Sequence, residues 1–277
     1  MTETELKPEW IAVDRRPAVP RAWAMRGATV LDERPVAGAL DTVIGDWLAA
    51  GAGDIVQSGE PVELTPVPAA PGKLVPQPGG DLSGARCWTL PGLTQSAPVD
   101  LMCGAETTIA GFLSLNPNWD GVICLPGAPT HWALISADEV VSFQSFLSLE
   151  IHAALGATGA PALDPEFAEA VADTMSRPER LAQRLNAARA GARLGDLADG
   201  AVADRMLGAL LGAELAAARP YWLGQQIALI GPPELTAPYA AALQTQAAMV
   251  TMAPDSGMTL TGLTAAWRRL PGQGSNS

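Results

Sequence analysis

A turn rich in proline and glycine, set between two short apolar runs, is the feature that most constrains how this chain folds. Val122–Leu125 is typical of a buried strand, and His131–Ile135 indicates a second strand that returns after Pro126–Pro129. Open α/β folds tend to bind ligands at the ends of their strands, so this turn is a candidate ligand site. An ordinary tight hairpin has the same pattern, and pattern alone favours that alternative.

The composition limits the class of protein and of partner. The chain has 277 residues, 48% of them hydrophobic, which is enough for one large or two ordinary domains with real cores. A formal net charge of −12 argues against nucleic acid or an anionic membrane as the main partner. An anionic substrate would therefore need a local cluster of cations. No uninterrupted apolar run reaches the roughly 18 residues of a membrane span, and the acidic, polar start of the chain does not resemble a signal peptide.

Cysteine and histidine usage argues against two kinds of stabilising site. The three cysteines, Cys87, Cys103 and Cys124, are far apart and form no C-x-x-C pair, so we expect a reducing compartment rather than a disulfide framework. The two histidines, His131 and His152, lack the H-x-x-x-H spacing of a zinc site. We expect a soluble, cytoplasmic protein.

The apolar patterning predicts two mixed α/β lobes. Strands are predicted at Trp10–Asp14, Arg21–Met25, Thr29–Leu31, Asp54–Gln57, Cys87–Leu90, Val122–Leu125, His131–Ile135, Glu139–Ser145, Ile227–Ile230 and Val250–Met252. Helices are predicted at 40–48, 107–115, 146–155, 164–174, 177–190, 201–219, 234–247 and 257–270. Residues 59–80, rich in proline and glycine, are expected to form a loop-rich excursion. We expect an N-terminal α/β lobe over 9–115, a C-terminal α/β lobe with Ala-rich helices over 116–272, and a tail over 273–277.

Polar residues at strand ends are the candidates for chemistry. The signatures G-x-x-x-x-G-K-[ST], G-x-G-x-x-G and G-x-S-x-G are absent from the sequence. Asp14 closes the first strand, where a carboxylate is a common arrangement for Mg²⁺ or phosphate; a turn-forming aspartate is the alternative interpretation. The other candidates are Glu106, His131 and Glu150. Trp23 and Trp132 are predicted to be packing residues.

An ordered series of short motifs resembles the 2-dehydro-3-deoxygalactonokinase family over roughly residues 9–270. The series is WIAVD followed by R-A-W, then PGL at Pro91–Leu93, M-x-G-x-E-T at Met102–Thr107, LPG and W at Leu125–Trp132, SFQSFLSLE at Ser142–Glu150, and LLGAELAAARPYWLGQQIALIG at Leu210–Gly231. The resemblance implies the two-lobed, ribonuclease-H-like α/β fold of the actin/hexokinase/Hsp70-like ATPases, with ATP in an interdomain cleft. It also implies transfer of the ATP γ-phosphate to the 6-hydroxyl of 2-dehydro-3-deoxy-D-galactonate in galactonate catabolism, with ATP and Mg²⁺ as cofactors. The implied partners are this sugar acid and ATP, with a homodimer as the candidate assembly.

The same resemblance implies roles for particular residues. Asp14 would be the carboxylate for Mg²⁺ and phosphate, and Glu106 or Glu150 would orient the sugar acid or act as the base. The residues expected to bind substrate or phosphate are Arg16, Arg21, Gly127, Thr130 and His131. Gly212 and Gly231 are expected on the nucleotide side.

The turn after the first strand departs from the family's pattern. In the family it reads Asp-Trp-Gly-Thr/Ser-Thr-Asn and cradles phosphate; here Arg16 replaces the glycine, Pro17 and Ala18 replace the hydroxyl residues, and Val19 replaces the asparagine. Proline has no amide hydrogen, and a residue other than glycine restricts close approach of the backbone. Arg15 and Arg16 can supply positive charge to phosphate, but solvated turn residues are equally typical. Two alternatives follow: a sugar-acid kinase, or a catalytically impaired member that binds sugar acid or nucleotide without turnover. An unrelated α/β domain is a third interpretation.

Overall fold

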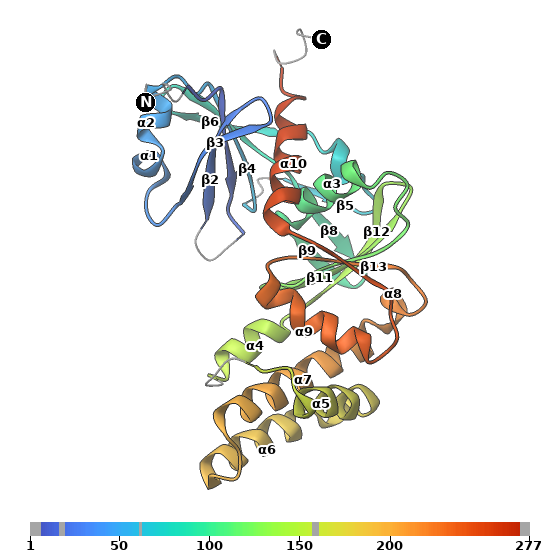
Figure 1. The fold of residues 1–277 in the computed structure, drawn as a ribbon. Coiled ribbons are helices and arrows are strands. Elements are labelled where there is room, and N and C mark those ends of the chain that lie inside the picture. Colours follow the sequence, from blue (N-terminus) through green and yellow to red (C-terminus); the bar gives the residue numbers. More distant parts are fainter. Residues whose placement is uncertain (1–6, 17–19, 61–62, 157–160, 272–277) are drawn as a thin grey trace. The chain divides into compact units, whose positions relative to one another are not determined.

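The computed structural model describes residues 7–16, 20–60, 63–156 and 161–271, and the chain divides into two compact units (Figure 1). Unit 1 comprises Met1–Trp119, Ser136–Val141 and Asp255–Ser277. Unit 2 comprises Asp120–Ile135 and Ser142–Pro254. This differs from the expected contiguous lobes over 9–115 and 116–272, because the last helix packs against unit 1 rather than against the segment that precedes it.

A six-stranded sheet forms the centre of unit 1, in the order β3-β2-β1-β4-β7-β6. Its strands are β1 (Trp10–Asp14), β2 (Arg21–Arg26), β3 (Thr29–Pro35), β4 (Asp54–Ser58), β6 (Gln77–Leu82) and β7 (Ala85–Thr89). The apolar strand β1 is buried along its whole length between antiparallel β2 and parallel β4. Successive side chains of a strand point to opposite faces, so Trp10 packs in one apolar cluster and Ile11 in another. Asp14 ends β1 opposite Ser58 of β4.

The face of this sheet that carries Trp10 is covered by α10 (Asp255–Trp267). α10 in turn lies against α3 (Ala105–Leu115) (Figure 1). Trp267 stacks on Trp10, with ring centroids 5.1 Å apart and planes inclined by 9°. The other face is covered by α1 (Leu40–Val43) and α2 (Gly45–Ala49), which bring Ile44 and Trp47 to the second cluster. One helix was predicted over 40–48; the structure has a break at Ile44.

The excursion over 59–80 contains more structure than its composition predicts. It holds β5 (Leu64–Pro66), the 3-10 helix η1 (Pro71–Lys73) and the start of β6. Two further strands that patterning does not predict, β8 (Gly92–Ser96) and β9 (Val99–Met102), join β5 in a three-stranded sheet of order β5-β8-β9. β5 and β9 are mostly exposed, and in β8 only Gly92 and Leu93 are buried, so these short strands lack the alternating apolar signal from which a strand is recognised.

Unit 2 is built on the predicted central hairpin. A five-stranded sheet of order β12-β11-β10-β13-β14 contains β10 (Gly121–Leu125), β11 (Thr130–Ser136), β12 (Glu139–Phe146), β13 (Ile227–Ile230) and β14 (Val250–Ala253). β10 and β11 pair antiparallel, with Leu125 opposite His131, which confirms the expected strand–turn–strand. β13 runs parallel to β10, and β14 runs parallel to β13. The turn therefore lies at the carboxyl ends of β10 and β13.

Helices supply the rest of the core of unit 2. They are α4 (Ser148–Ala154), α5 (Pro165–Ser176), the 3-10 helix η2 (Pro178–Arg180), α6 (Leu181–Leu194), α7 (Asp199–Ala217), α8 (Arg219–Trp222) and α9 (Pro233–Gln244). The alanine-rich helices α5, α6 and α7 lie side by side (Figure 1). Trp132 packs among the apolar residues of α5, α7 and α9 and is fully buried. Trp23, in unit 1, is 2% exposed, so both tryptophans are packing residues as predicted.

In the part of the chain that the structure describes, none of the helices combines the length and the apolar character needed to cross a membrane.

Candidate functional site

The carboxylate of Asp14 is held by the side chain of Arg16, two residues further along the chain. Asp14 is 3% exposed. The backbone N and Nε of Arg16 each donate to Oδ1 of Asp14 at 3.1 Å, and Nη2 donates to Oδ2 at 2.7 Å. Both carboxylate oxygens therefore accept hydrogen bonds from one guanidinium group, which is the strong, charge-assisted form of this interaction.

Arg16 also connects the end of β1 to the first turns of α10. Its Nη2 donates to Asp255 at 3.1 and 3.3 Å and to Oγ1 of Thr259 at 2.7 Å. Thr259 in turn contacts Oγ1 of Thr108, on α3, at 2.8 Å. Burial by itself would lower the pKa of Arg16, but the charges of Asp14 and Asp255 outweigh it and raise the pKa. The guanidinium is therefore a permanent cation in this cluster.

Glu106 is a buried carboxylate in the first turn of α3, 1% exposed. Its two oxygens accept hydrogen bonds from the backbone N of Gly104 at 2.9 and 2.7 Å, and Thr107 donates to one of them at 3.3 Å. Burial raises the pKa of Glu106 to about 7, despite these hydrogen bonds and the positive charge of Arg16. Such a carboxyl group can exchange a proton near neutral pH.

Glu106 also borders a cavity of about 260 Å³ in unit 1. The remaining lining residues are Pro71, Gly72, Leu74, Leu90, Thr107, Ala110, Ser114, Gly262, Ala265 and Arg269. The lining is mostly apolar, so a small ligand there would meet few charged groups besides Glu106 and Arg269.

In unit 2, the central turn brings Thr130 and His131 into a buried hydrogen-bonded cluster. Thr130 Oγ1 lies 3.3 Å from both N and O of Gly127 and 2.9 Å from the hydroxyl of Tyr239. His131 is 6% exposed, and its Nδ1 lies 2.7 Å from Oγ of Ser145. Tyr239 of α9 and Ser145 of β12 therefore hold the two residues that directly follow the turn.

Glu214, the carboxylate at the centre of this cluster, is not among the site residues predicted from the sequence. It is 2% exposed and accepts hydrogen bonds from Nε1 of Trp132 at 2.8 Å and from the hydroxyl of Tyr239 at 3.1 Å. Burial raises the pKa of Glu214, although these donors and Ser148 act against the rise. The available signal was the position of Glu214, four residues after Leu210 in the apolar stripe of α7, where a charged residue predicts a buried, partnered carboxylate.

The other four predicted site residues make none of the hydrogen bonds described for these two clusters. Arg21 is exposed on β2 and pairs with Glu33 of β3 at 2.8 Å. Glu150 is exposed on α4. Gly212 of α7 faces α5, where a Cβ on it would lie 2.4 Å from the carbonyl oxygen of Val171. Gly231 is the residue that follows the carboxyl end of β13, and it lies near Pro126 of the central turn.

The predicted residues thus fall into two groups. Asp14, Arg16 and Glu106 lie in unit 1. Gly127, Thr130, His131 and Gly231 lie near the central turn of unit 2. Their convergence on one cleft stays a prediction. Residues Pro17–Val19, on which part of the altered-turn prediction depends, lie outside the described residues.

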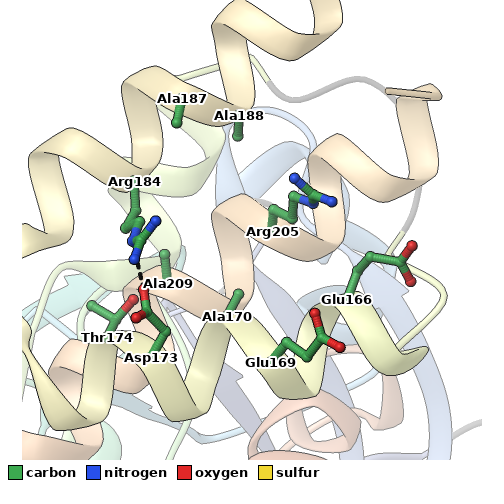
Figure 2. A pocket seen from close by; sticks show the side chains of 10 residues that line it. All are labelled: Glu166, Glu169, Ala170, Asp173, Thr174, Arg184, Ala187, Ala188, Arg205 and Ala209. Atoms are coloured by element: carbon green, nitrogen blue, oxygen red, sulfur yellow. Dashed lines mark ion pairs between the residues drawn. The ribbon is translucent and has the colours of Figure 1, made fainter. Parts of the chain in front are cut away.

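A second pocket, of about 270 Å³, lies among α5, α6 and α7 in unit 2 (Figure 2). Its lining residues are Glu166, Glu169, Ala170, Asp173, Thr174, Arg184, Ala187, Ala188, Arg205 and Ala209. Figure 2 shows the ion pair between Arg184 and Asp173 at one end of the pocket. The side chains of Arg205, Glu166 and Glu169 lie toward the other end, where no ion pair is drawn. Three carboxylates and two guanidinium groups give the pocket little net charge, and none of the residues predicted from the sequence lines it.

The residues around Asp14 do not fit a magnesium ion in their present arrangement. Mg²⁺ needs oxygen ligands with near-ideal octahedral geometry, whereas both oxygens of Asp14 accept hydrogen bonds from Arg16. Across residues 7–16, 20–60, 63–156 and 161–271, no group of three or more histidine, cysteine, aspartate or glutamate side chains is placed to hold a metal ion.

Comparison with known proteins identifies one family. A family model described as DGOK, 2-keto-3-deoxy-galactonokinase, matches residues 10–266. The probable 2-dehydro-3-deoxygalactonokinase DgoK1 of Rhizobium meliloti (strain 1021) is 28% identical over 195 residues, which are 65% of this chain and 64% of that protein. The 2-dehydro-3-deoxygalactonokinase of Escherichia coli (strain K12) is 31% identical over 180 residues, 61% of this chain and 60% of that protein. The chain thus spans less than two thirds of either curated relative.

Solved structures resemble this chain over nearly its whole length. A protein from Sinorhizobium meliloti, assigned as a 2-dehydro-3-deoxygalactonokinase, has a TM-score of 0.86 at 24% identity and covers 96% of this chain and 98% of its own. Component A of (R)-2-hydroxyglutaryl-CoA dehydratase from Acidaminococcus fermentans has a TM-score of 0.50 at 10% identity, covering 94% and 98%. At these identities the likeness concerns the fold, and it confirms the expected two-lobed α/β fold of the actin/hexokinase/Hsp70-like ATPases.

Proposed function

Because the chain belongs to the 2-keto-3-deoxy-galactonokinase family, we propose that it transfers the γ-phosphate of ATP to the 6-hydroxyl of 2-dehydro-3-deoxy-D-galactonate. The name of the Escherichia coli relative supports the substrate, and the family match supports ATP as the phosphate donor. The observation that carries the proposal is a cluster of charged residues inside the matched region. Asp14 is buried at the carboxyl end of β1 and is held by the half-buried Arg16, and Glu106 is buried at the start of α3. Cytoplasmic location and a homodimer stay predictions.

The proposed roles follow from charge and burial. Phosphoryl transfer depends on positioning and on stabilising charge at the phosphoryl oxygens, for which the Arg16 guanidinium is suited. Glu106 is the better candidate for the base, because its pKa of about 7 suits proton transfer at neutral pH and it borders a cavity. Glu150 is the weaker candidate because it is exposed on α4. On the side of unit 2, Thr130, His131 and Gly127 are proposed to contact the sugar acid or its phosphate, and Gly231 the nucleotide.

A second candidate function is binding of sugar acid or nucleotide without turnover. It is favoured by the contacts of Arg16, which occupy both oxygens of Asp14. A carboxylate whose charge is already neutralised by a guanidinium group is a poor ligand for a metal ion that neutralises the transferred phosphate. Loss of one such electrostatic contact lowers phosphoryl-transfer rates by orders of magnitude without unfolding the protein.

An ADP-release assay with Mg·ATP and 2-dehydro-3-deoxy-D-galactonate, combined with calorimetric titration of each ligand, tests both candidates. We expect turnover that is measurable but below the roughly 1–100 s⁻¹ typical of kinases. Calorimetric binding without ADP release would select the second candidate. Absence of both binding and turnover would contradict both.

Two variants separate the candidate bases in the same assay. Glu106→Gln should lower turnover by about 10²–10⁴-fold, the usual contribution of a general base. Glu150→Gln is the matched control and should leave turnover within about twofold of the wild type, because position 150 is exposed. The reverse result would transfer the role of base to Glu150.

A further inference from the structure

We propose that Arg16 takes the place of a divalent cation at Asp14, so that an internal guanidinium group neutralises this carboxylate and the isolated protein has no metal site there. The proposal concerns unit 1 alone and holds whether or not the chain is an active kinase.

The contacts of Arg16 are those of a bound counter-ion. It bridges two carboxylates that are far apart in the sequence, Asp14 at the end of β1 and Asp255 at the start of α10. The hydroxyl of Thr259 adds a further oxygen at 2.7 Å from Nη2. Carboxylate and hydroxyl oxygens gathered from separate elements are the kind of ligands that Mg²⁺ prefers, and here they surround a guanidinium group.

The backbone around Arg16 is shaped to hold its side chain in this position. A Cβ on Gly104 would lie 2.4 Å from Cγ and 2.5 Å from Cδ of Arg16, so the stem of the arginine lies directly against the bare backbone of this glycine. A Cβ on Gly59 would lie 3.0 Å from the backbone N of Arg16. Only 18% of the side chain of Arg16 is exposed. Gly104 therefore packs against the stem of Arg16 and Gly59 against its backbone, while the charged end reaches both carboxylates.

The charges make the guanidinium and a divalent cation mutually exclusive. Asp14 and Asp255 carry two negative charges, and Arg16 already supplies one positive charge between them. A metal ion at Asp14 would compete with Nε and Nη2 for the carboxylate oxygens and would lie next to the guanidinium cation. Like charges at such a distance, away from bulk water, repel strongly. Removal of the arginine should therefore create a cation site where the wild type has none.

Titration with Mn²⁺, followed by the electron paramagnetic resonance of the free ion, tests the proposal without substrate or turnover. We compare the wild type, Asp14→Asn, Arg16→Ala and the double variant Asp14→Asn/Arg16→Ala. The wild type and Asp14→Asn should give the same titration. Arg16→Ala should bind one additional equivalent of Mn²⁺ that the double variant loses, and Mn²⁺ should raise its melting temperature but not that of the wild type.

Arg15→Ala is the matched control, because Arg15 is the neighbouring arginine but contacts Gln57 and Glu60 instead of Asp14. It should titrate like the wild type. Saturable Mn²⁺ binding to the wild type that Asp14→Asn abolishes would overturn the proposal, and so would a folded Arg16→Ala variant that gains no site. If Arg16→Ala does not fold with or without Mn²⁺, the comparison of the wild type with Asp14→Asn decides: coincident titrations support the proposal, and an equivalent that depends on Asp14 overturns it.

Discussion

Gly262 of α10 lies directly against Thr107 of α3, so that a Cβ on the glycine would stand 2.1 Å from the carbonyl oxygen of the threonine. The contact is reciprocal, because a Cβ on Gly111 of α3 would stand 1.8 Å from the carbonyl oxygen of Met258. This close crossing sets the position of the first turns of α10. It therefore places Thr259 beside Thr108, at 2.8 Å between hydroxyl oxygens.

We expect Gly262→Ala to destabilise the protein by about 3 kcal/mol, the upper end of the usual cost of overpacking, because two helix backbones must move apart. Gly257→Ala is the matched control on the same helix, where a Cβ meets nothing within 4 Å. It should be neutral or stabilise by up to about 1 kcal/mol, because alanine favours a helix over glycine. Urea unfolding measures both, and equal stability of the two variants would contradict the close crossing.

Gly104 provides a second comparison of paired variants, which concerns Arg16. Gly104 has φ of +94° and Gly84 has φ of +90°, so alanine should be strained by about 1–2 kcal/mol at either position. A Cβ at position 84 meets nothing within 4 Å, whereas one at position 104 clashes with the stem of Arg16. Gly104→Ala should thus cost about 1–3 kcal/mol more than Gly84→Ala in urea unfolding. An equal cost would mean that the stem of Arg16 moves freely.

The pKa of Glu106 predicts a pH dependence of stability. Its folded-state pKa is raised from 4.5 to about 7 by burial, so the folded state holds a proton that the unfolded state releases between these values. The contribution of Glu106 is therefore fully present below about pH 4.5 and is lost as the pH rises through about 7, on the order of 3 kcal/mol in total. Glu106→Gln removes this titration. The melting temperature of the wild type, measured relative to Glu106→Gln, should fall between pH 4.5 and 7.5, and a constant difference would contradict the raised pKa.

The elements with the strongest apolar patterning are the ones that the sequence predicts well. β1, β10 and β13 are short continuous apolar runs, and the structure has all three as buried strands. β8 and β9 were missed because β8 is buried only at its start and β9 is mostly exposed, so neither gives a periodic apolar signal. The single helix expected over 40–48 is two short helices, because periodicity does not reveal a break at one residue.

Only part of the candidate site could be predicted from the sequence. Asp14 and Glu106 could be selected because each lies at the boundary of an element that is visible in the sequence. No local pattern connects Asp255 or Thr259 to Arg16, since these contacts join residues separated by 239 and 243 positions. The exposed positions of Arg21 and Glu150 were not predictable either, because a resemblance in sequence does not give the burial of a side chain.

The hydrogen bond from Trp132 to the Glu214 carboxylate can be compared with that of a second buried tryptophan, Trp222. Trp132→Phe removes the Nε1 donor to the Glu214 carboxylate, at 2.8 Å. Trp222→Phe, in the same apolar cluster, removes a donor to the neutral carbonyl oxygen of Leu215, also at 2.8 Å. Hydrogen bonds to charged groups contribute about 1.5–3 kcal/mol and neutral ones about 0.5–1.5 kcal/mol, so Trp132→Phe should cost about 1 kcal/mol more.

The pH dependence of these two variants should also differ. Burial raises the pKa of Glu214, and the bond from Trp132 opposes that rise by favouring the charged form. Without this donor the pKa of Glu214 rises further, so the deficit of Trp132→Phe relative to the wild type should grow as the pH rises from 5 to 8. The deficit of Trp222→Phe should stay constant, because Leu215 does not titrate. Urea unfolding at both pH values measures the two deficits, and a deficit of Trp132→Phe that does not change with pH would show that its indole does not stabilise a charged Glu214.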